Sequence, residues 1–177
     1  MPWGMSDAED ARGWAGGWAV IARVGTRRIA FPAGEVSSIT SVPPMWRPPT
    51  APRPVVGFLP LAGAVLPVLD AGILLGVARP ARTGFYAHIL VLPGAARSGA
   101  GLLVDRAEDT IAITEDVVSP FREADTLNGC AIALAETGDG QMHVLSAARL
   151  LAVAETAALA ALEDAAARRL MEWEIPA

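Results

Sequence analysis

The residues of this sequence that could do chemistry are few and lie apart. Among 177 residues there are two histidines, His88 and His143, and one cysteine, Cys130. All three lie among apolar neighbours in segments typical of β-strands, which favours satisfied or buried side chains over a base, a nucleophile or a ligand. A metal site needs several His, Cys or carboxylate groups at a suitable spacing. The sequence offers no such cluster and predicts neither a metal nor another cofactor.

Two aspartates at strand ends are the remaining candidates for acid–base chemistry. Asp70 and Asp105 each close an apolar run. As a pair they could serve as general acid and base, and as structural groups they would cap a turn or helix; the structural interpretation is favoured. The segment 94–101 is glycine-rich but lacks the Gly-Lys-Ser/Thr of a phosphate loop, so a hairpin turn is expected there. Without a nucleophile–base pair, we expect a protein that is not an enzyme.

The composition excludes several classes of function. With 14 basic and 19 acidic residues the formal net charge is −5, and no basic stripe is visible, which argues against a nucleic-acid partner. A single cysteine cannot form an intrachain disulfide, which fits a reducing compartment. The longest uncharged apolar run, 54–69, is shorter than the ~20 residues of a membrane-spanning helix and is interrupted by prolines. We expect a cytoplasmic protein that does not insert into a membrane.

Apolar runs separated by turn residues predict a mostly β fold. The clearest is a hairpin over 55–69, where two apolar runs flank Ala62-Gly63. Asp70 then predicts the N-cap of a short helix that stops at Gly76. The regular spacing of the turns suggests small β-barrels. Further strands are expected at 18–24, 27–32, 86–92, 100–105, 110–113, 128–135 and 142–145.

Two segments predict little regular structure. Residues 1–16 are polar and glycine-rich, which predicts a disordered tail. Residues 42–54 contain too many prolines for a helix or a strand and predict an extended connector. Trp46 lies in that connector, where two interpretations are equally open. It could clamp the connector to a barrel, or it could contact a partner, since tryptophan is enriched in binding hot spots.

The C-terminal segment 146–174 has no glycine or proline and predicts a long helix with Ser146 as its N-cap. Steps of three and four residues place one set of apolar positions on a single face: Leu159, Leu162, Ala166, Leu170 and Trp173. The first half of this helix is expected to dock on a barrel. The second half is a candidate for self-association through Leu159, Leu162, Leu170 and Trp173, which would otherwise be exposed.

Several motifs, taken in chain order, resemble the CheW family of adaptor proteins in bacterial chemosensory arrays. Glu35–Ile39 is similar to the family's x-V-x-E-I motif, and the hairpin and its aspartate are similar to G-[VI]-x-N-L-R-G-x-[VI]-x-P-[VI]-[VI]-D-L. Gly101–Ala107 resembles G-[LI]-[LV]-V-D-x-V, and Thr110–Pro120 resembles an apolar segment that follows it. The resemblance runs from about Trp18 to Leu151.

The resemblance implies a fold and a set of partners. The fold is a pair of SH3-like, five-stranded β-barrels in a CheW-like domain over 17–151, with subdomain one at about 17–83 and subdomain two at about 84–145. The helix would pack on, or project from, subdomain one. The implied partners are the regulatory domain of a CheA-type histidine kinase and the cytoplasmic tip of a chemoreceptor. The candidate partner-binding residues are Val36, Ser38, Ile39, Trp46, Leu61, Ala62, Gly63 and Val65.

Two departures from the family motifs leave alternatives open. The motif glutamate is Ser38 here and the motif arginine is Ala62. Losing both charges together avoids a stranded charge, so the fold can survive, but an arginine at a hairpin tip is also suited to partner contact. The alternatives are a divergent module of a non-chemotaxis pathway, such as pili or development, and a small-molecule-sensing β-barrel.

Overall fold

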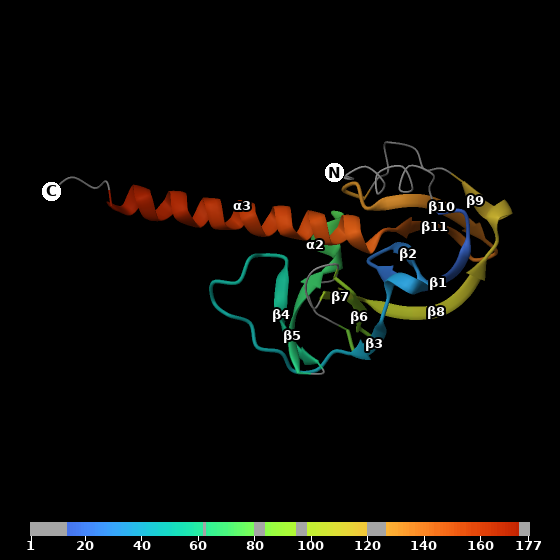
Figure 1. The fold of residues 1–177 in the computed structure, drawn as a ribbon, viewed down its shortest axis with the longest axis horizontal. Coiled ribbons are helices and arrows are strands. Elements are labelled where there is room, and N and C mark those ends of the chain that lie inside the picture. Colours follow the sequence, from blue (N-terminus) through green and yellow to red (C-terminus); the bar gives the residue numbers. More distant parts are fainter. Residues whose placement is uncertain (1–13, 62, 80–83, 95–98, 120–126, 174–177) are drawn as a thin grey trace, which may run out of the picture.

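The structure is a computed structural model that describes residues 14–61, 63–79, 84–94, 99–119 and 127–173. Of the tail predicted at 1–16, residues 1–13 lie outside them. Two β-sheets lie side by side (Figure 1). Sheet one has the order β8-β1-β2-β11-β10-β9. Its strands are β1 (Gly17–Val24), β2 (Arg27–Pro32), β8 (Arg106–Ile113), β9 (Val118–Ser119), β10 (Ala131–Thr137) and β11 (Gly140–Leu145).

Sheet two has the order β3-β6-β7-β5-β4. Its strands are β3 (Ser38–Ser41), β4 (Val55–Leu61), β5 (Ala64–Asp70), β6 (His88–Leu92) and β7 (Ala100–Val104). The helices are α2 (Ala71–Leu75), α3 (Ala147–Trp173) and the short 3-10 turns η1 (Ala33–Glu35) and η2 (Glu115–Val117). The predicted hairpin at 55–69 and the helix after it are confirmed: Asp70 accepts a hydrogen bond from Ile73 N, and Gly76 ends α2 at φ +66°.

The mostly β prediction with two sheets and a C-terminal helix is confirmed, but the predicted SH3-like, five-stranded barrels are not. Sheet one has six strands instead of five, and both sheets have an open order with an edge strand at each side. Each sheet also contains one parallel pair, β2 with β11 and β5 with β7. Because the parallel pair β2–β11 joins strands from the two ends of the chain, the sheets do not coincide with the sequential segments 17–83 and 84–145.

Both faces of each sheet are buried, because successive side chains of a strand point to opposite faces. In β1, Val20, Ala22 and Val24 belong to a central core that both sheets share, whereas Ala19 and Ile21 belong to a core of sheet one alone. Sheet two has its own core as well, around Leu66, Val68, Ile89, Val91 and Leu103. The central core therefore fixes the two sheets to each other.

Among its described residues, helix α3 is anchored to the core near its beginning. Ser146 caps it as predicted, since its Oγ accepts a hydrogen bond from Arg149 N (3.4 Å), and Glu35 Oε2 accepts one from Ala147 N (2.6 Å). Ala147, Leu150 and Ala154 pack into the central core. Figure 1 shows the distal end of α3 projecting beyond both sheets. In the described part of the chain, no helix has the length and apolar character needed to cross a membrane.

Candidate partner-binding surface

The two aspartates considered for chemistry meet at one arginine. The Arg79 side chain is 9% exposed and lies 2.9 Å from Asp70 and 2.7 Å from Asp105. Asp105 also accepts a hydrogen bond from Gly25 N (2.6 Å), in the turn between β1 and β2. The group therefore links that turn of sheet one to the ends of β5 and β7 in sheet two.

The electrostatics of this cluster are those of a structural ion pair. Burial opposes the charge on Arg79, but hydrogen bonds and charges from Asp105 and Asp70 outweigh it and raise the pKa of the guanidinium. Both carboxylates are occupied by this arginine and by backbone N–H groups. The structural interpretation of the aspartates agrees with these contacts. Sequence reasoning missed Arg79, because an arginine in a loop after Gly76 carries no local signal of its burial.

The histidines and the cysteine lie in structural environments. His88 Nδ1 accepts a hydrogen bond from Ala107 N (3.2 Å), and His143 is buried in β11. Burial raises the pKa of the Cys130 thiol to about 11, although the charge of Arg149 opposes the shift. A thiol with that pKa is a poor nucleophile at neutral pH. Among the described residues, no group of three or more His, Cys, Asp or Glu side chains could hold a metal ion.

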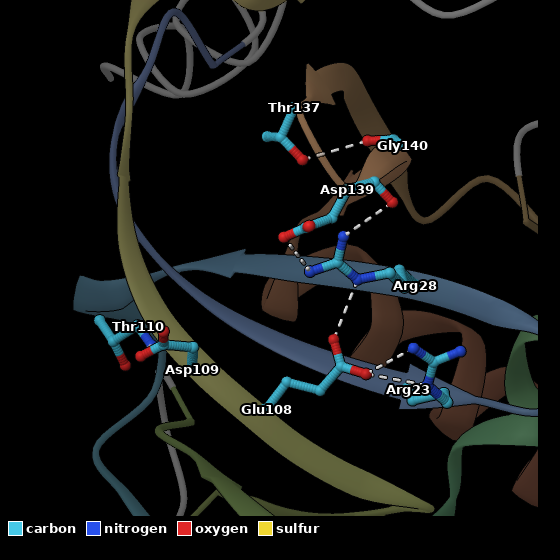
Figure 2. A network of polar contacts seen from close by, with 8 residues as sticks. All are labelled: Arg23, Arg28, Glu108, Asp109, Thr110, Thr137, Asp139 and Gly140. Carbon is cyan, nitrogen blue, oxygen red and sulfur yellow. Dashed lines mark hydrogen bonds and ion pairs between the residues drawn. The ribbon is translucent and has the colours of Figure 1, made fainter.

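A second ion-pair cluster lies on sheet one, at the strands β8, β1 and β2 (Figure 2). Glu108 of β8 lies 2.7 Å from Arg23 of β1 and 2.9 Å from Arg28 of β2. Arg28 also reaches the carbonyl oxygen of Asp139 (3.4 Å). Partial burial would raise the pKa of Glu108, but the two arginines lower it below its usual value. These residues could not be singled out from the sequence, because the pairing of β1 with β2 and β8 brings them together only in the fold.

The first group of sequence-predicted binding residues lies at the β3 edge of sheet two. β3 pairs with β6, through Ser38 opposite Val91 and Ile39 opposite Leu90, and stands at the end of the sheet order. Ser38 and Ile39 are exposed, whereas Val36 packs against the central core. An exposed edge strand presents backbone N–H and C=O groups to a partner.

The second group lies at the opposite edge, on β4 and β5. Trp46 forms an isolated bridge to Phe58 of β4, whose N–H donates to the Trp46 carbonyl (3.0 Å). The Trp46 side chain nevertheless stays 69% exposed, and Val65 is 65% exposed. The backbone of Trp46 thus clamps the connector, while its indole remains available for contact.

The remaining candidates are placed only in part. Leu61 packs partly against the core of sheet two, and Gly63 adopts φ +81° in the hairpin turn, a conformation that favours glycine. Ala62 lies outside the described residues. The backbone of α3 is helical through Leu159, Leu162, Leu170 and Trp173, but their side chains lie outside what the structure describes.

One exposed aromatic group was not singled out from the sequence. Phe85 is fully exposed and Tyr86 largely so, at the entry to β6. The Arg106 guanidinium lies 5.7 Å from the Tyr86 ring centroid, a cation–π contact. Their exposure was not predictable, because these aromatics precede an apolar run and fit the start of a buried strand.

Comparisons with known proteins agree on one family. The family model described as "CheW-like domain" matches residues 19–155. A "Probable chemotaxis protein CheW" of Rhizobium etli is 30% identical over 101 residues, 57% of this chain and 64% of that protein. A "Chemotaxis protein CheW" of Rhizobium meliloti is 31% identical over 106 residues, 59% of this chain and 67% of that protein. The first match therefore spans just under two thirds of its relative.

A solved structure has the same fold. The scaffolding protein TtCheW from Thermoanaerobacter tengcongensis matches with a TM-score of 0.68 and 19% sequence identity, covering 74% of this chain and 89% of that chain. The family model covers most of the sequence and the central core that joins the two sheets. This chain belongs to the CheW-like domain family.

Proposed function

We propose that this protein is a non-enzymatic adaptor of a bacterial chemosensory complex. The observation that carries the proposal is the match of the CheW-like family model to residues 19–155, because CheW-family proteins are scaffolds without catalytic activity. The structural setting of Asp70, Asp105 and Cys130 supports the same conclusion. The protein acts in the cytoplasm, and its two sheets correspond to the two SH3-like barrels of the family.

As an adaptor, the protein couples the cytoplasmic tip of a chemoreceptor to the regulatory domain of a CheA-type histidine kinase. The edges of sheet two supply the contacts: Val36, Ser38 and Ile39 at one edge, and Trp46, Leu61, Gly63 and Val65 at the other. Ala62, which lies outside the described residues, stays a candidate from its motif alone. The exposed apolar side chains Ile39, Trp46 and Val65 support this assignment, since apolar and aromatic anchors carry most of the binding energy of an interface.

The absence of the motif charges favours one second candidate function. Ser38 and Ala62 stand where the family motifs have glutamate and arginine. A surface without these charges presents different chemistry to the usual partners. A divergent adaptor of a non-chemotaxis pathway, with partners of its own, is therefore the alternative.

A binding titration by calorimetry tests the adaptor function directly. The full-length protein is titrated with the regulatory domain of each CheA-type kinase of its own genome, and we expect a Kd on the order of micromolar for one of them. Binding to the kinase of a non-chemotaxis pathway instead would select the alternative. A folded protein that binds none of these domains would contradict both functions.

Two tryptophans of similar exposure provide a matched pair of variants for the contact surface. Trp46 on sheet two is 69% exposed and Trp18 on sheet one is 63% exposed. Trp46→Ala is expected to weaken kinase or receptor binding roughly tenfold or more, as for a hot-spot residue. Trp18→Ala is expected to change it less than about twofold. Equal losses, or a larger loss for Trp18→Ala, would contradict the assignment to sheet two.

A further inference from the structure

The distal part of helix α3 has no contact with the central core among the residues that the structure describes. The helix extends over Ala147–Trp173, and Ala154 is the last of its described side chains that the central core buries. The 19 residues beyond it span about 28 Å at 1.5 Å per residue, and the distal end of the helix projects past both sheets (Figure 1). In proteins most of the stability of a helix comes from packing of its apolar face and not from helix propensity. A second helix against this segment would stabilise it.

The apolar positions of the distal helix form a pattern that is the same in both directions. Leu159, Leu162, Ala166, Leu170 and Trp173 follow each other at steps of three, four, four and three residues. Such steps place the five positions on one face of a helix. Asp164 and Arg168 are exposed, and each lies two residues, about 200° of helix rotation, from Ala166. The segment therefore has one apolar face and one charged face.

A pattern that is symmetric under reversal fits a copy of itself that runs in the opposite direction. We infer that the distal half of α3 pairs antiparallel with the same segment of a second copy of this chain, about a two-fold axis at Ala166. Position 162 then lies level with position 170 of the second copy, and position 159 lies level with position 173. The small Ala166 at the centre permits close approach of the two backbones, and the interface is the same patch on both copies.

The length of the exposed helix also fits this arrangement. The helical end of the second copy, at Trp173, comes level with Leu159, which is five residues beyond Ala154. The two anchoring points at Ala154 are then 24 residues apart along the paired helices, or about 36 Å. The sheets of one copy therefore do not obstruct the helix of the other. A parallel pair would instead bring both sets of sheets to the same end.

The pairing does not rest on the proposed function, because it needs neither kinase nor receptor. The symmetric pattern covers about two heptads, fewer than the three or four typical of a stable coiled coil, so we expect a reversible dimer in the micromolar range. Sedimentation analysis of the full chain over a concentration series, up to about 100 μM, should show a monomer–dimer equilibrium. A wild-type protein that remains monomeric throughout this range would overturn the inference.

Variants on the two faces of the helix locate the interface. Leu162→Glu and Leu170→Glu are each expected to weaken dimerisation at least about tenfold. Asp164→Ala and Arg168→Ala, on the charged face, should leave the dimer in place. Circular dichroism and thermal unfolding should show that all four variants keep their sheets folded. A Leu162→Glu protein that dimerises as well as wild type would overturn the inference.

Disulfide trapping then determines the direction of pairing. Leu162→Cys and Leu170→Cys proteins are mixed under oxidising conditions, one carrying an affinity tag so that mixed products have a distinct mass. Antiparallel pairing predicts cross-links between the two variants, and parallel pairing predicts cross-links within each variant. Wild type is the control, since Cys130 is buried and should not react. Cross-links within each variant, or none at all, would overturn the antiparallel arrangement.

Discussion

The surface of sheet one and the edges of sheet two differ in whether their side chains have partners within the chain. On sheet one, Glu108 is held between Arg23 and Arg28, and Arg28 also lies 4.0 Å from Asp139, so each of these charges has a partner of opposite sign. At the edges of sheet two, Ile39, Trp46 and Val65 remain exposed. A set of ion pairs that is complete within the chain gains little from a partner. Apolar side chains that remain in water gain from being covered, and for that reason the proposed contacts lie on sheet two.

The comparison depends on the two sheets unfolding as one unit. A substitution in the central core tests this, and we expect it to have the largest effect on the free energy of unfolding. Phe31 of β2 is fully buried there. Phe31→Ala should cost about 3–5 kcal/mol of unfolding free energy, because a large buried side chain leaves a cavity. Urea unfolding followed by both tryptophan fluorescence and circular dichroism should show one common transition. Two separate transitions, only one of them shifted, would mean that the sheets unfold independently.

The next effect concerns the contact between the sheets at Arg79. Arg79→Met leaves Asp70 and Asp105 without their shared cation, and breaking such a partly buried pair should cost roughly 2–4 kcal/mol. Arg28→Met on sheet one is the matched control and should cost about 1 kcal/mol or less, since Glu108 keeps Arg23 as its partner. Urea unfolding at neutral pH measures both. Equal losses for the two arginines would argue against a special role of Arg79 between the sheets.

Local structure was predictable from the sequence where neighbours along the chain pair with each other. The hairpin β4–β5, the cap at Asp70 and the stop at Gly76 follow from an apolar alternation and turn residues over about 20 positions. The start of α3 at Ser146 was predicted in the same way. Each of these features is decided by contacts within a few residues, which a pattern in one sequence can reveal.

Long-range pairing was not predictable in the same way. The parallel pairs β2–β11 and β5–β7 join segments that no turn connects, and they determine which strands share a sheet. β8 was expected at 110–113 but begins at Arg106, because its charged residues, among them Glu108, hide the strand pattern. The candidate contacts at Ser38 and Trp46 came from motifs and composition; their positions at opposite edges of sheet two required the structure.

The smallest expected effect concerns the ion pairs of sheet one and has a defined pH dependence. The arginines beside Glu108 lower the pKa of its carboxyl below the usual 4.5. The carboxylate therefore contributes stability above the unfolded pKa, and this contribution is lost as the pH falls through the lower, folded-state pKa. Glu108→Gln should cost about 1 kcal/mol or less at pH 7. The difference from wild type should shrink as the pH falls below about 4.5.

Urea unfolding of wild type and Glu108→Gln at several pH values measures this difference. Asp139→Asn is the control: its carboxylate is largely exposed and lies 4.0 Å from Arg28, so the substitution should have little effect at any pH. If Glu108→Gln had no effect at neutral pH, the cluster would contribute nothing measurable to stability. The stability of sheet one would then come from its buried side chains alone. The contrast between the sheets would rest on the exposed apolar residues of sheet two.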